Sequence, residues 1–204
     1  MCYYILGLLF TDGNLDKSKS KLTLSLTEKE LIEKLYPYFS DTKKRKIYYS
    51  NDTNTNHAPS YAIINSNSKV IEKVENIGIK PNKTLGLDFP ELDSLTKKIS
   101  FMRGVFDGDG SVYKQVTRSN NKEYCYTNIS FTSGSEKFAN GMMIYLSEMG
   151  IKSTLFVDKR KTKKNYTYYV YIRKKEYVKK FFDLIYNNPN SIYMKRKYLK
   201  YLKI

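Results

Sequence analysis

Two segments of the chain could perform the same chemistry. Residues 5–13 read ILGLLFTDG and residues 102–110 read MRGVFDGDG, and both end in Asp-Gly. Each segment has apolar residues at its first, fourth and fifth positions and glycine at its third. Two carboxylates in close approach repel each other, and a divalent cation removes that conflict. If the segments meet, Asp12 and Asp109 are therefore expected to hold metal ions.

The small residues of these segments predict how they meet. As short helices, both carry an apolar stripe that would face the core. Gly7 and Gly104 lie on a second face, together with Thr11 and Gly108 four residues later. Small side chains on this face would let the two backbones pack closely and bring the aspartates together at the C-terminal helix ends. The free carbonyl groups there predict that those near Thr11 and Gly108 could join the metal ligands.

The elements that follow are repeated as well. Alternating stretches such as KLTLSLT and YTNISFTS predict half-buried strands, and the apolar spacing of EKELIEKLYPYF and SEKFANGMMIYLSEMG predicts helices. Two more strands and a helix follow in each case. The predicted fold is therefore α+β, with two pseudo-twofold-related αββαββα halves at 1–79 and 98–204. The segment 80–97 contains Pro and Gly and is predicted to be a surface linker.

Composition narrows the classes of function. The chain has 204 residues and a net charge of +16, which indicates a polyanionic partner. Cys2 and Cys125 are isolated and His57 is the only histidine, which disfavours zinc centres, disulfide frameworks and histidine-dependent nuclease sites. Carboxylates must then form any metal site, which suits Mg²⁺. No apolar run is long enough to span a membrane and no signal peptide is recognisable, so an intracellular protein, cytoplasmic or organellar, is expected.

Residues that could contact bases and phosphates follow both segments. Arg and Lys suit guanine or phosphate, Asn and Gln suit adenine, and a two-stranded ribbon fits the major groove. For any single residue, a solvated loop position is the simpler interpretation, but the whole set favours DNA contact. The candidates are Asn14, Lys17, Lys19, Lys21, Thr23, Lys43, Lys44, Arg45, Lys46, Tyr48, Tyr113, Lys114, Gln115, Thr117, Arg118, Asn120, Lys122, Arg160, Lys161, Lys163, Lys164 and Lys174.

These features resemble the LAGLIDADG homing endonuclease family in its single-chain form with two motif copies. The resemblance runs from Tyr4 to the segment RKYLKYL near the C-terminus. The second copy, FMRGVFDGDGSVY, is the stronger match. The first, YYILGLLFTDGNL, has Phe10 where the family usually has an acidic residue. Asp107 fills that place in the second copy and is expected to be structural.

The resemblance implies a saddle of two four-stranded antiparallel sheets astride double-stranded DNA. It also implies a divalent-metal-dependent nuclease that cuts both strands across the minor groove, leaves 3′ overhangs and serves intron homing. Mg²⁺ is the expected cofactor, with Mn²⁺ as a substitute, and the catalytic metal-binding role falls on Asp12 and Asp109. Because both motif copies are in one chain, a monomer is expected.

Relatives in this family commonly place a basic residue near the scissile phosphates. Placing Ile64 on Ile172 aligns the last strands of the two halves and puts Asn65 opposite Arg173. If Ile172 points into the core, alternation sends Arg173 to the DNA-facing side. Arg173 is therefore expected to be either a catalytic residue or a phosphate anchor, with Lys174 beside it as a substitute.

Three other functions fit parts of the sequence. A splicing cofactor (maturase) with the same fold would bind intron RNA, and cleavage of a DNA duplex would separate the two functions. A non-catalytic DNA-binding protein could share the scaffold, although the presence of both Asp12 and Asp109 disfavours it. An unrelated nuclease of the PD-(D/E)xK type would use Asp41-Thr42-Lys43, but no suitably placed Pro-Asp precedes this segment.

Overall fold

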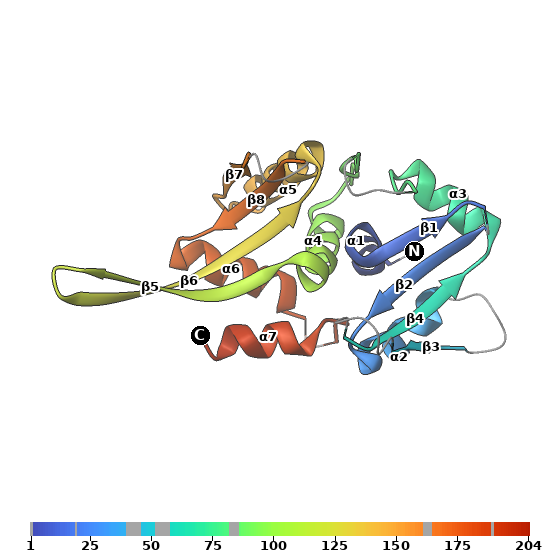
Figure 1. Cartoon of the computed structure of the whole chain (residues 1–204), viewed down its shortest axis with the longest axis horizontal. Helices are drawn as coiled ribbons and strands as arrows, with labels where there is room; N and C mark the ends of the chain where they lie inside the picture. The colour runs from blue at the N-terminus through green and yellow to red at the C-terminus, as the bar shows by residue number, and fades with distance from the viewer. Residues whose placement is uncertain are drawn as a thin grey trace.

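The chain forms two halves that repeat one order of elements (Figure 1). The computed structural model describes residues 2–18, 20–39, 46–51, 58–81, 86–160, 165–188 and 190–204. The first half contains α1 (Tyr3–Asp12), β1 (Gly13–Asp16), β2 (Lys21–Leu26), α2 (Lys29–Phe39), β3 (Tyr48–Ser50), β4 (Ser60–Asn65) and α3 (Ser68–Asn76). The second contains α4 (Leu95–Asp109), β5 (Ser111–Ser119), β6 (Lys122–Ser133), α5 (Glu136–Glu148), β7 (Thr154–Asp158), β8 (Thr167–Ile172), α6 (Lys175–Tyr186) and α7 (Lys195–Leu202). The predicted α+β order is confirmed, and α7 is added after the second copy.

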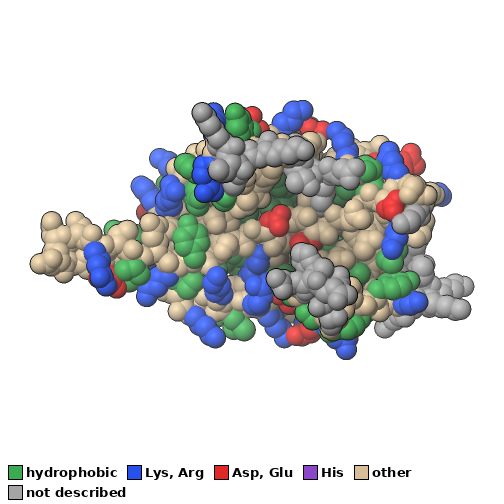
Figure 2. Space-filling model, in the orientation of Figure 1, with side chains coloured by type: hydrophobic (Ala, Val, Ile, Leu, Met, Phe, Trp, Pro, Cys, Tyr) green, Lys and Arg blue, Asp and Glu red, His purple; other side chains and the backbone are tan. Residues whose placement is uncertain are grey.

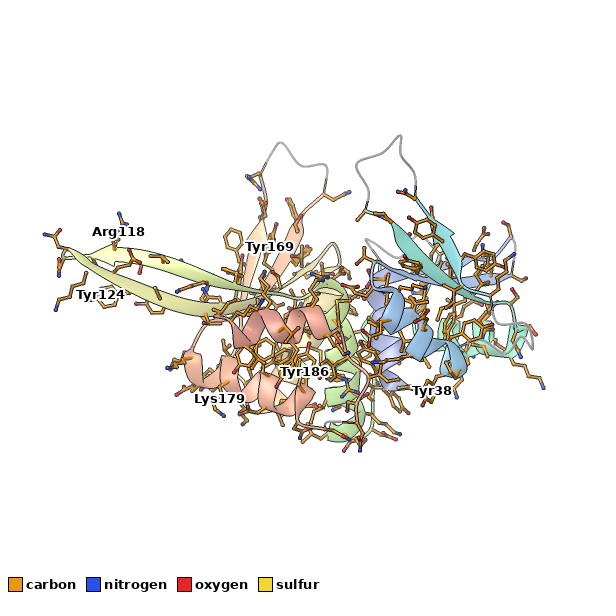
Figure 3. All side chains as sticks on the ribbon, turned by 90° about the horizontal axis from the view of Figure 1, so that it is seen from below. Tyr38, Arg118, Tyr124, Tyr169, Lys179 and Tyr186 are labelled. Carbon is orange, nitrogen blue, oxygen red and sulfur yellow. The ribbon has the colours of Figure 1, made fainter. Side chains whose placement is uncertain are left out.

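Each half contains one antiparallel four-stranded sheet. The strand orders, β1-β2-β4-β3 and β5-β6-β8-β7, are the same in both halves. Figure 1 shows α1 and α4 side by side between the two sheets, and Figure 3 shows helices below the sheets. The opposite faces of the sheets are therefore left open on one side of the molecule. Within the described residues, no helix has both the length and the apolar character needed to cross a bilayer.

Strand alternation explains why one face of each sheet is covered. Leu22, Leu24 and Leu26 of β2 are buried, whereas the residues between them are half-exposed. In β8 the burial pattern is the same, with Val170 and Ile172 fully buried. The period of two places these apolar side chains against the helices and leaves the alternate side chains on the open face.

The predicted alignment of the last strands was wrong by one residue. In the first sheet, Asn14 of β1 pairs with Thr23 of β2, which pairs with Ile64 of β4. At the same place in the second sheet, Ser111 of β5 pairs with Ser130 of β6, which pairs with Tyr171 of β8. Ile64 therefore corresponds to Tyr171, and Asn65 corresponds to Ile172. A one-residue shift moves every side chain of a strand to the other face, and burial agrees with the new register because Asn65 and Ile172 are both buried. The polar Asn65, which donates to the Phe39 carbonyl, concealed this position from an alignment of apolar residues.

The second part of the linker is packed rather than running freely over the surface. Leu87 is buried, and its carbonyl oxygen accepts a hydrogen bond from the Ser135 hydroxyl at 2.7 Å. The Tyr145 hydroxyl of α5 donates to the Pro90 carbonyl at 2.6 Å. Helix α4 begins at Leu95, inside the segment predicted as a linker. Segment 86–94 is therefore packed as part of the second half. This packing buries Leu87 and gives the carbonyl groups of Leu87 and Pro90 hydrogen-bond donors.

Strands β5 and β6 form a hairpin that projects well beyond the second sheet (Figure 1). Its turn is Asn120-Asn121, with φ of 51° and 57°. Positive φ at both central residues of a two-residue turn matches the right-handed twist of the strands, and asparagine tolerates it. Arg118 and Tyr124 lie near the tip of this hairpin (Figure 3).

Candidate functional site

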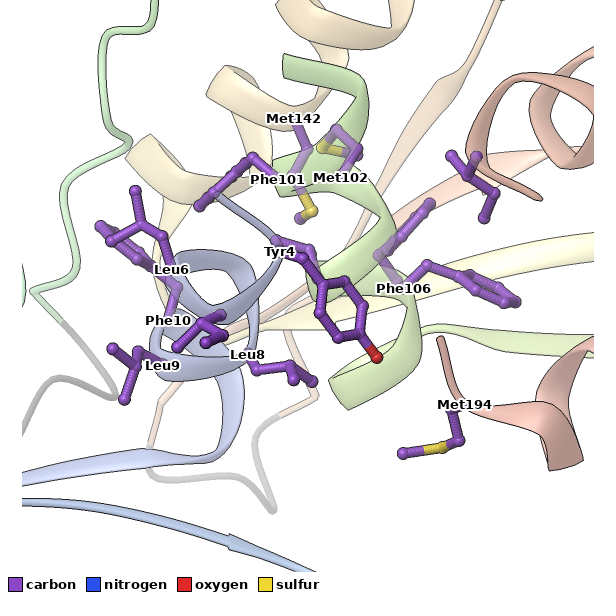
Figure 4. Close-up of a cluster of buried hydrophobic side chains, with 14 of the residues drawn as sticks. Tyr4, Leu6, Leu8, Leu9, Phe10, Phe101, Met102, Phe106, Met142 and Met194 are labelled. Carbon is purple, nitrogen blue, oxygen red and sulfur yellow. The ribbon is translucent and has the colours of Figure 1, made fainter. Parts of the chain in front are cut away.

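Helices α1 and α4 pack closely along the seam between the two halves. A Cβ atom on Gly7 would overlap the Phe101 carbonyl oxygen and lie 2.9 Å from Gly104 Cα. A Cβ atom on Gly104 would overlap the Tyr4 carbonyl oxygen and lie 2.9 Å from Gly7 Cα. Only glycine fits at these crossing points, and the sequence placed both glycines on this face. Large apolar side chains fill the space on either side (Figure 4).

The two candidate catalytic carboxylates stand at the C-terminal ends of these helices. Asp12 is the last residue of α1 and Asp109 is the last residue of α4. A Cβ atom on Gly108, the neighbour of Asp109, would lie 2.5 Å from Asp12 Oδ2. The Thr11 hydroxyl donates to Asp12 Oδ2 at 2.9 Å and so orients this carboxylate. Figure 2 shows acidic side chains near the centre of the open face, among Lys and Arg side chains.

A buried lysine that sequence reasoning missed lies beside this site. Lys197 Nζ donates to the carbonyl oxygens of Phe106, Gly108 and Gly110 at 2.7, 2.7 and 2.6 Å. A cation on the free carbonyls at a helix C-terminus is favourable. Burial lowers the pKa of Lys197 to about 8, and nearby Asp107, Asp109 and Asp12 act in the opposite direction. Lys197 therefore lies within electrostatic reach of both candidate metal ligands.

A weak sequence signal for Lys197 does exist. Helix α7 has an inward stripe that includes Met194, Lys197 and Tyr201 at helical spacing. A lysine on such a stripe must bury its amine and needs partners for it. One of those partners is Gly108, whose carbonyl was predicted to join the metal ligands. The Gly108 carbonyl oxygen thus accepts a hydrogen bond from an ammonium group. Its role as a metal ligand stays a prediction, as it does for Asp12, Asp109 and Thr11.

Lys197→Met is expected to destabilise the fold. The methionine chain fills similar space but removes the ammonium donor from three carbonyl groups, of which that of Phe106 also accepts from the Gly110 N–H. We expect a cost of about 2 kcal/mol in unfolding free energy. Urea denaturation measures this change through the midpoint concentration. Lys200→Met is the matched control because Lys200 lies exposed on the same helix. Equal midpoints for the two variants would contradict the assigned role.

Asp107 is a fully buried anchor rather than a metal ligand. Its carboxylate accepts hydrogen bonds from the Tyr4 hydroxyl at 2.7 Å, the Tyr186 hydroxyl at 2.5 Å and the Met194 backbone N–H at 2.8 Å. Burial raises the pKa of Asp107 to about 6, and these three hydrogen bonds act against that rise. The carboxylate thus joins α1, the end of α6 and the start of α7 to α4.

Arg173 lies where β8 ends, and Ile172 before it is buried as the prediction required. Its guanidinium donates to the Thr154 hydroxyl at 3.3 Å and stacks 4.3 Å from the centre of the Tyr171 ring. These contacts lie within the β7–β8 pair. A catalytic role for Arg173 stays a prediction.

The donor set at the seam fits a hard divalent cation. Mg²⁺ is usually held by one or two carboxylates, with substrate phosphates and water completing its shell. Asp12 and Asp109 supply two carboxylates, and in the described part of the chain no group of three Asp, Glu, His or Cys side chains is arranged to hold a metal. A hollow of about 280 Å³ lies beside Asp109, lined also by Thr11 and Ser133. The arrangement leaves room for phosphate and water oxygens.

Part of the predicted DNA-contact set lies on the open faces of the sheets. Strand pairing and alternation place these side chains opposite the buried ones. They are Asn14, Lys21, Thr23 and Tyr48 in the first sheet and Tyr113, Gln115, Thr117 and Lys122 in the second. Lys46 stacks over Tyr48, and Asn120 forms the hairpin turn.

Other predicted contacts have acidic partners or a different orientation. The ion pairs are Lys17 with Glu75, Arg118 with Glu123, Arg160 with Asp158 and Lys174 with Glu176. Register places Lys114 and Arg118 on the same side of the hairpin as buried Val112, away from the open face. The pairs of Lys17, Arg118 and Lys174 lie at the surface and are weak, so they could exchange for phosphate contacts. Arg160, by contrast, holds the buried Asp158 through both carboxylate oxygens. The remaining candidates, Lys19, Lys43, Lys44, Arg45, Lys161, Lys163 and Lys164, lie outside the described residues, as do His57 and Asp41-Thr42-Lys43.

Part of the chain matches a known family by sequence. Residues 96–186 match the family model of the LAGLIDADG-like domain. Comparison with curated protein sequences gave no significant match.

Solved structures match nearly the whole chain. The homing endonuclease I-DmoI in complex with DNA and Ca is similar with a TM-score of 0.61 and 14% identity, over 98% of this chain and 96% of that chain. The meganuclease I-SmaMI bound to uncleaveable DNA has a TM-score of 0.58 and 13% identity, over 90% and 84%. The N-terminal LAGLIDADG domain of DUF199/WhiA has a TM-score of 0.56 and 17% identity, over 90% and 79%. The second half of this chain is therefore a LAGLIDADG-like domain, and the chain as a whole has the LAGLIDADG fold in its single-chain form with two motif copies.

Proposed function

We propose that the chain is a sequence-specific, divalent-metal-dependent endonuclease that cuts both strands of a DNA duplex. The observation that carries the proposal is the meeting of Asp12 and Asp109 at the ends of the two seam helices, on the face left open between the sheets. The similar nucleases I-DmoI and I-SmaMI are described in complex with DNA, and I-DmoI with Ca, Mn or Mg.

Each group at the site has a role in this proposal. Asp12 and Asp109 hold Mg²⁺, for which Mn²⁺ substitutes, and Thr11 fixes the orientation of the first carboxylate. When bound there, a divalent cation would supply Lewis-acid chemistry to the attacking water and the scissile phosphate. Lys197 offsets negative charge at the end of α4, where two acidic groups and helix carbonyls accumulate.

The open sheet faces bind the duplex on either side of the site. The β1–β2 and β5–β6 ribbons enter the major groove, where Asn14, Gln115 and Lys122 contact base edges or phosphates. The cut falls across the minor groove between them and leaves 3′ overhangs. One intracellular monomer then acts on one target site, in keeping with intron homing.

The direct test is a cleavage selection on a library of randomised duplexes in Mg²⁺. A single recovered site, cut on both strands, establishes the activity and the partner together. Binding of duplex without cleavage in any divalent metal would instead favour a non-catalytic DNA-binding protein. Selective binding of structured RNA without DNA cleavage would favour the maturase alternative.

Affinity for DNA is expected to fall steeply with salt. Each neutralised phosphate releases counterions, and a protein with a net charge of +16 that binds along both sheets should make many such contacts. Titration by fluorescence anisotropy at several salt concentrations gives the slope of log affinity against log salt. We expect a slope steeper than about −3. A shallower slope means few phosphate contacts and rejects a saddle that binds along both sheets.

A further inference from the structure

The two seam helices meet through residues at matched positions that differ in chemistry. Alignment through the two aspartates matches Tyr4 with Phe101 and Phe10 with Asp107. Across the seam, the Tyr4 hydroxyl donates to Asp107 Oδ2 at 2.7 Å. In the related contact, the Phe10 and Phe101 rings meet edge to face with centroids 5.4 Å apart. One crossing is therefore polar and its counterpart is aromatic.

A second matched position differs in size. Thr11 of α1 corresponds to Gly108 of α4. A Cβ atom on Gly108 would overlap the Thr11 hydroxyl oxygen and crowd the Asp12 carboxylate. The seam accepts one threonine and one glycine here, and a threonine on both sides would force the helices apart.

Ion pairs between the two halves also distinguish the first half from the second. Lys195 and Arg196, at the start of α7, pair with Glu30 at 2.9 Å and Glu28 at 2.7 Å beside α2. The burial patterns of α2 and α5 match Leu31 with Phe138, which puts Lys137 of the second half at the position of Glu30. A second-half copy in place of the first half would thus present a lysine to Lys195.

We propose that these matched differences form a pairing code, by which each half binds the other half and rejects a copy of itself. Two first halves would oppose Thr11 to Thr11 and leave both Tyr4 hydroxyls against Phe10 rings. Two second halves would turn both buried Asp107 carboxylates toward Phe101 rings. Unpaired buried polar groups and steric overlap against the wrong partner give specificity without strengthening the correct pair.

The code has a consequence for the shape of the binding surface. Because unlike halves pair, the open face always combines two different sheets, one with the long β5–β6 hairpin and one without it. The partner surface so formed is asymmetric and suits a duplex with two different half-sites. The pairing itself does not depend on nuclease activity, so loss of cleavage in the tests above would leave it standing.

A rescue experiment in the full chain tests the code. Phe10→Asp should lower the melting temperature sharply, because a buried carboxylate then faces the Phe101 and Phe138 rings. Adding Phe101→Tyr should recover part of that loss, because the new hydroxyl can donate to the new carboxylate as the Tyr4 hydroxyl donates to Asp107. Phe131→Tyr is the matched control, because Phe131 is buried against Phe106 and Phe181 instead. If Phe101→Tyr recovers no more than Phe131→Tyr, the code is rejected.

Partner choice can then be measured directly. A protease site inserted at 82–85 allows the folded, purified chain to be cut between the halves, and native mass spectrometry reports which halves stay together. We expect only unlike pairs from the wild-type sequence, and pairs of first halves once Tyr4→Phe and Thr11→Gly remove both barriers. Abundant like pairs from the wild-type sequence, or exclusively unlike pairs from the double variant, would overturn the proposal.

Discussion

Asp12→Asn and Asp109→Asn are each expected to remove double-strand cleavage while duplex binding remains. Asparagine keeps the shape of the side chain but loses the charge that holds a divalent cation against the scissile phosphate. Loss of one such electrostatic group costs about 10²–10³-fold in rate, and the single-turnover rate at saturating protein measures it. Ca²⁺ should support binding with little cutting.

The matched control for these variants is Asp183→Asn. Asp183 is an exposed carboxylate on α6 that pairs with Lys179 at 2.6 Å, on the helical side of the molecule. Its replacement removes the same charge and should leave the cleavage rate unchanged. Wild-type cutting of both strands by Asp12→Asn would reject the paired-carboxylate site, even if the fold and DNA binding are as proposed.

Gly104→Ala is expected to cause a large loss of stability, although it adds only one methyl group to the seam. The new Cβ would overlap the Tyr4 carbonyl oxygen, which is backbone and cannot rotate away. Separating α1 from α4 would also disturb the buried side chains on both sides of them. Overpacking of this kind costs about 3 kcal/mol, which lowers the melting temperature of a chain of this size by roughly 6–12 °C.

Gly86→Ala provides the control for this prediction. A Cβ atom on Gly86 would meet no atom within 4 Å, so its melting temperature should stay close to wild type or rise slightly. Differential scanning calorimetry of the two variants gives the comparison. Similar melting temperatures for Gly104→Ala and Gly86→Ala would mean that the helices can separate without cost, and the close seam would lose its energetic importance.

The paired glycines and aspartates were predictable because their signals are local. A glycine on a helix face and an Asp-Gly at its end recur in both motifs, and each motif is only nine residues long. Alternation in β2 and β6 predicted strands, and three-to-four spacing predicted α2 and α5, because burial of one face imposes these periods on the sequence. Repetition of the whole order then predicted two related halves.

Features that depend on contacts between distant segments were decided by the tertiary structure. Lys197 reaches the carbonyls of Gly108 and its neighbours from the other end of the second half, and Asp107 collects donors from α1, α6 and the start of α7. No period along the chain encodes these meetings, because they arise from how the helices pack after the loops close.

The one-residue error at β4 has the same origin. Alternation of side chains along this strand could be predicted from the sequence, but Asn65 looked like an outward residue because it is polar. Only the pairing with β2 and the hydrogen bond to Phe39 place it inside. Local patterns in the sequence were therefore enough to predict the duplication, the elements and the two aspartates. The register, the buried lysine and the asymmetry of the seam follow only from the packing of distant segments, because a buried polar group is stable only where the packed chain supplies its partner.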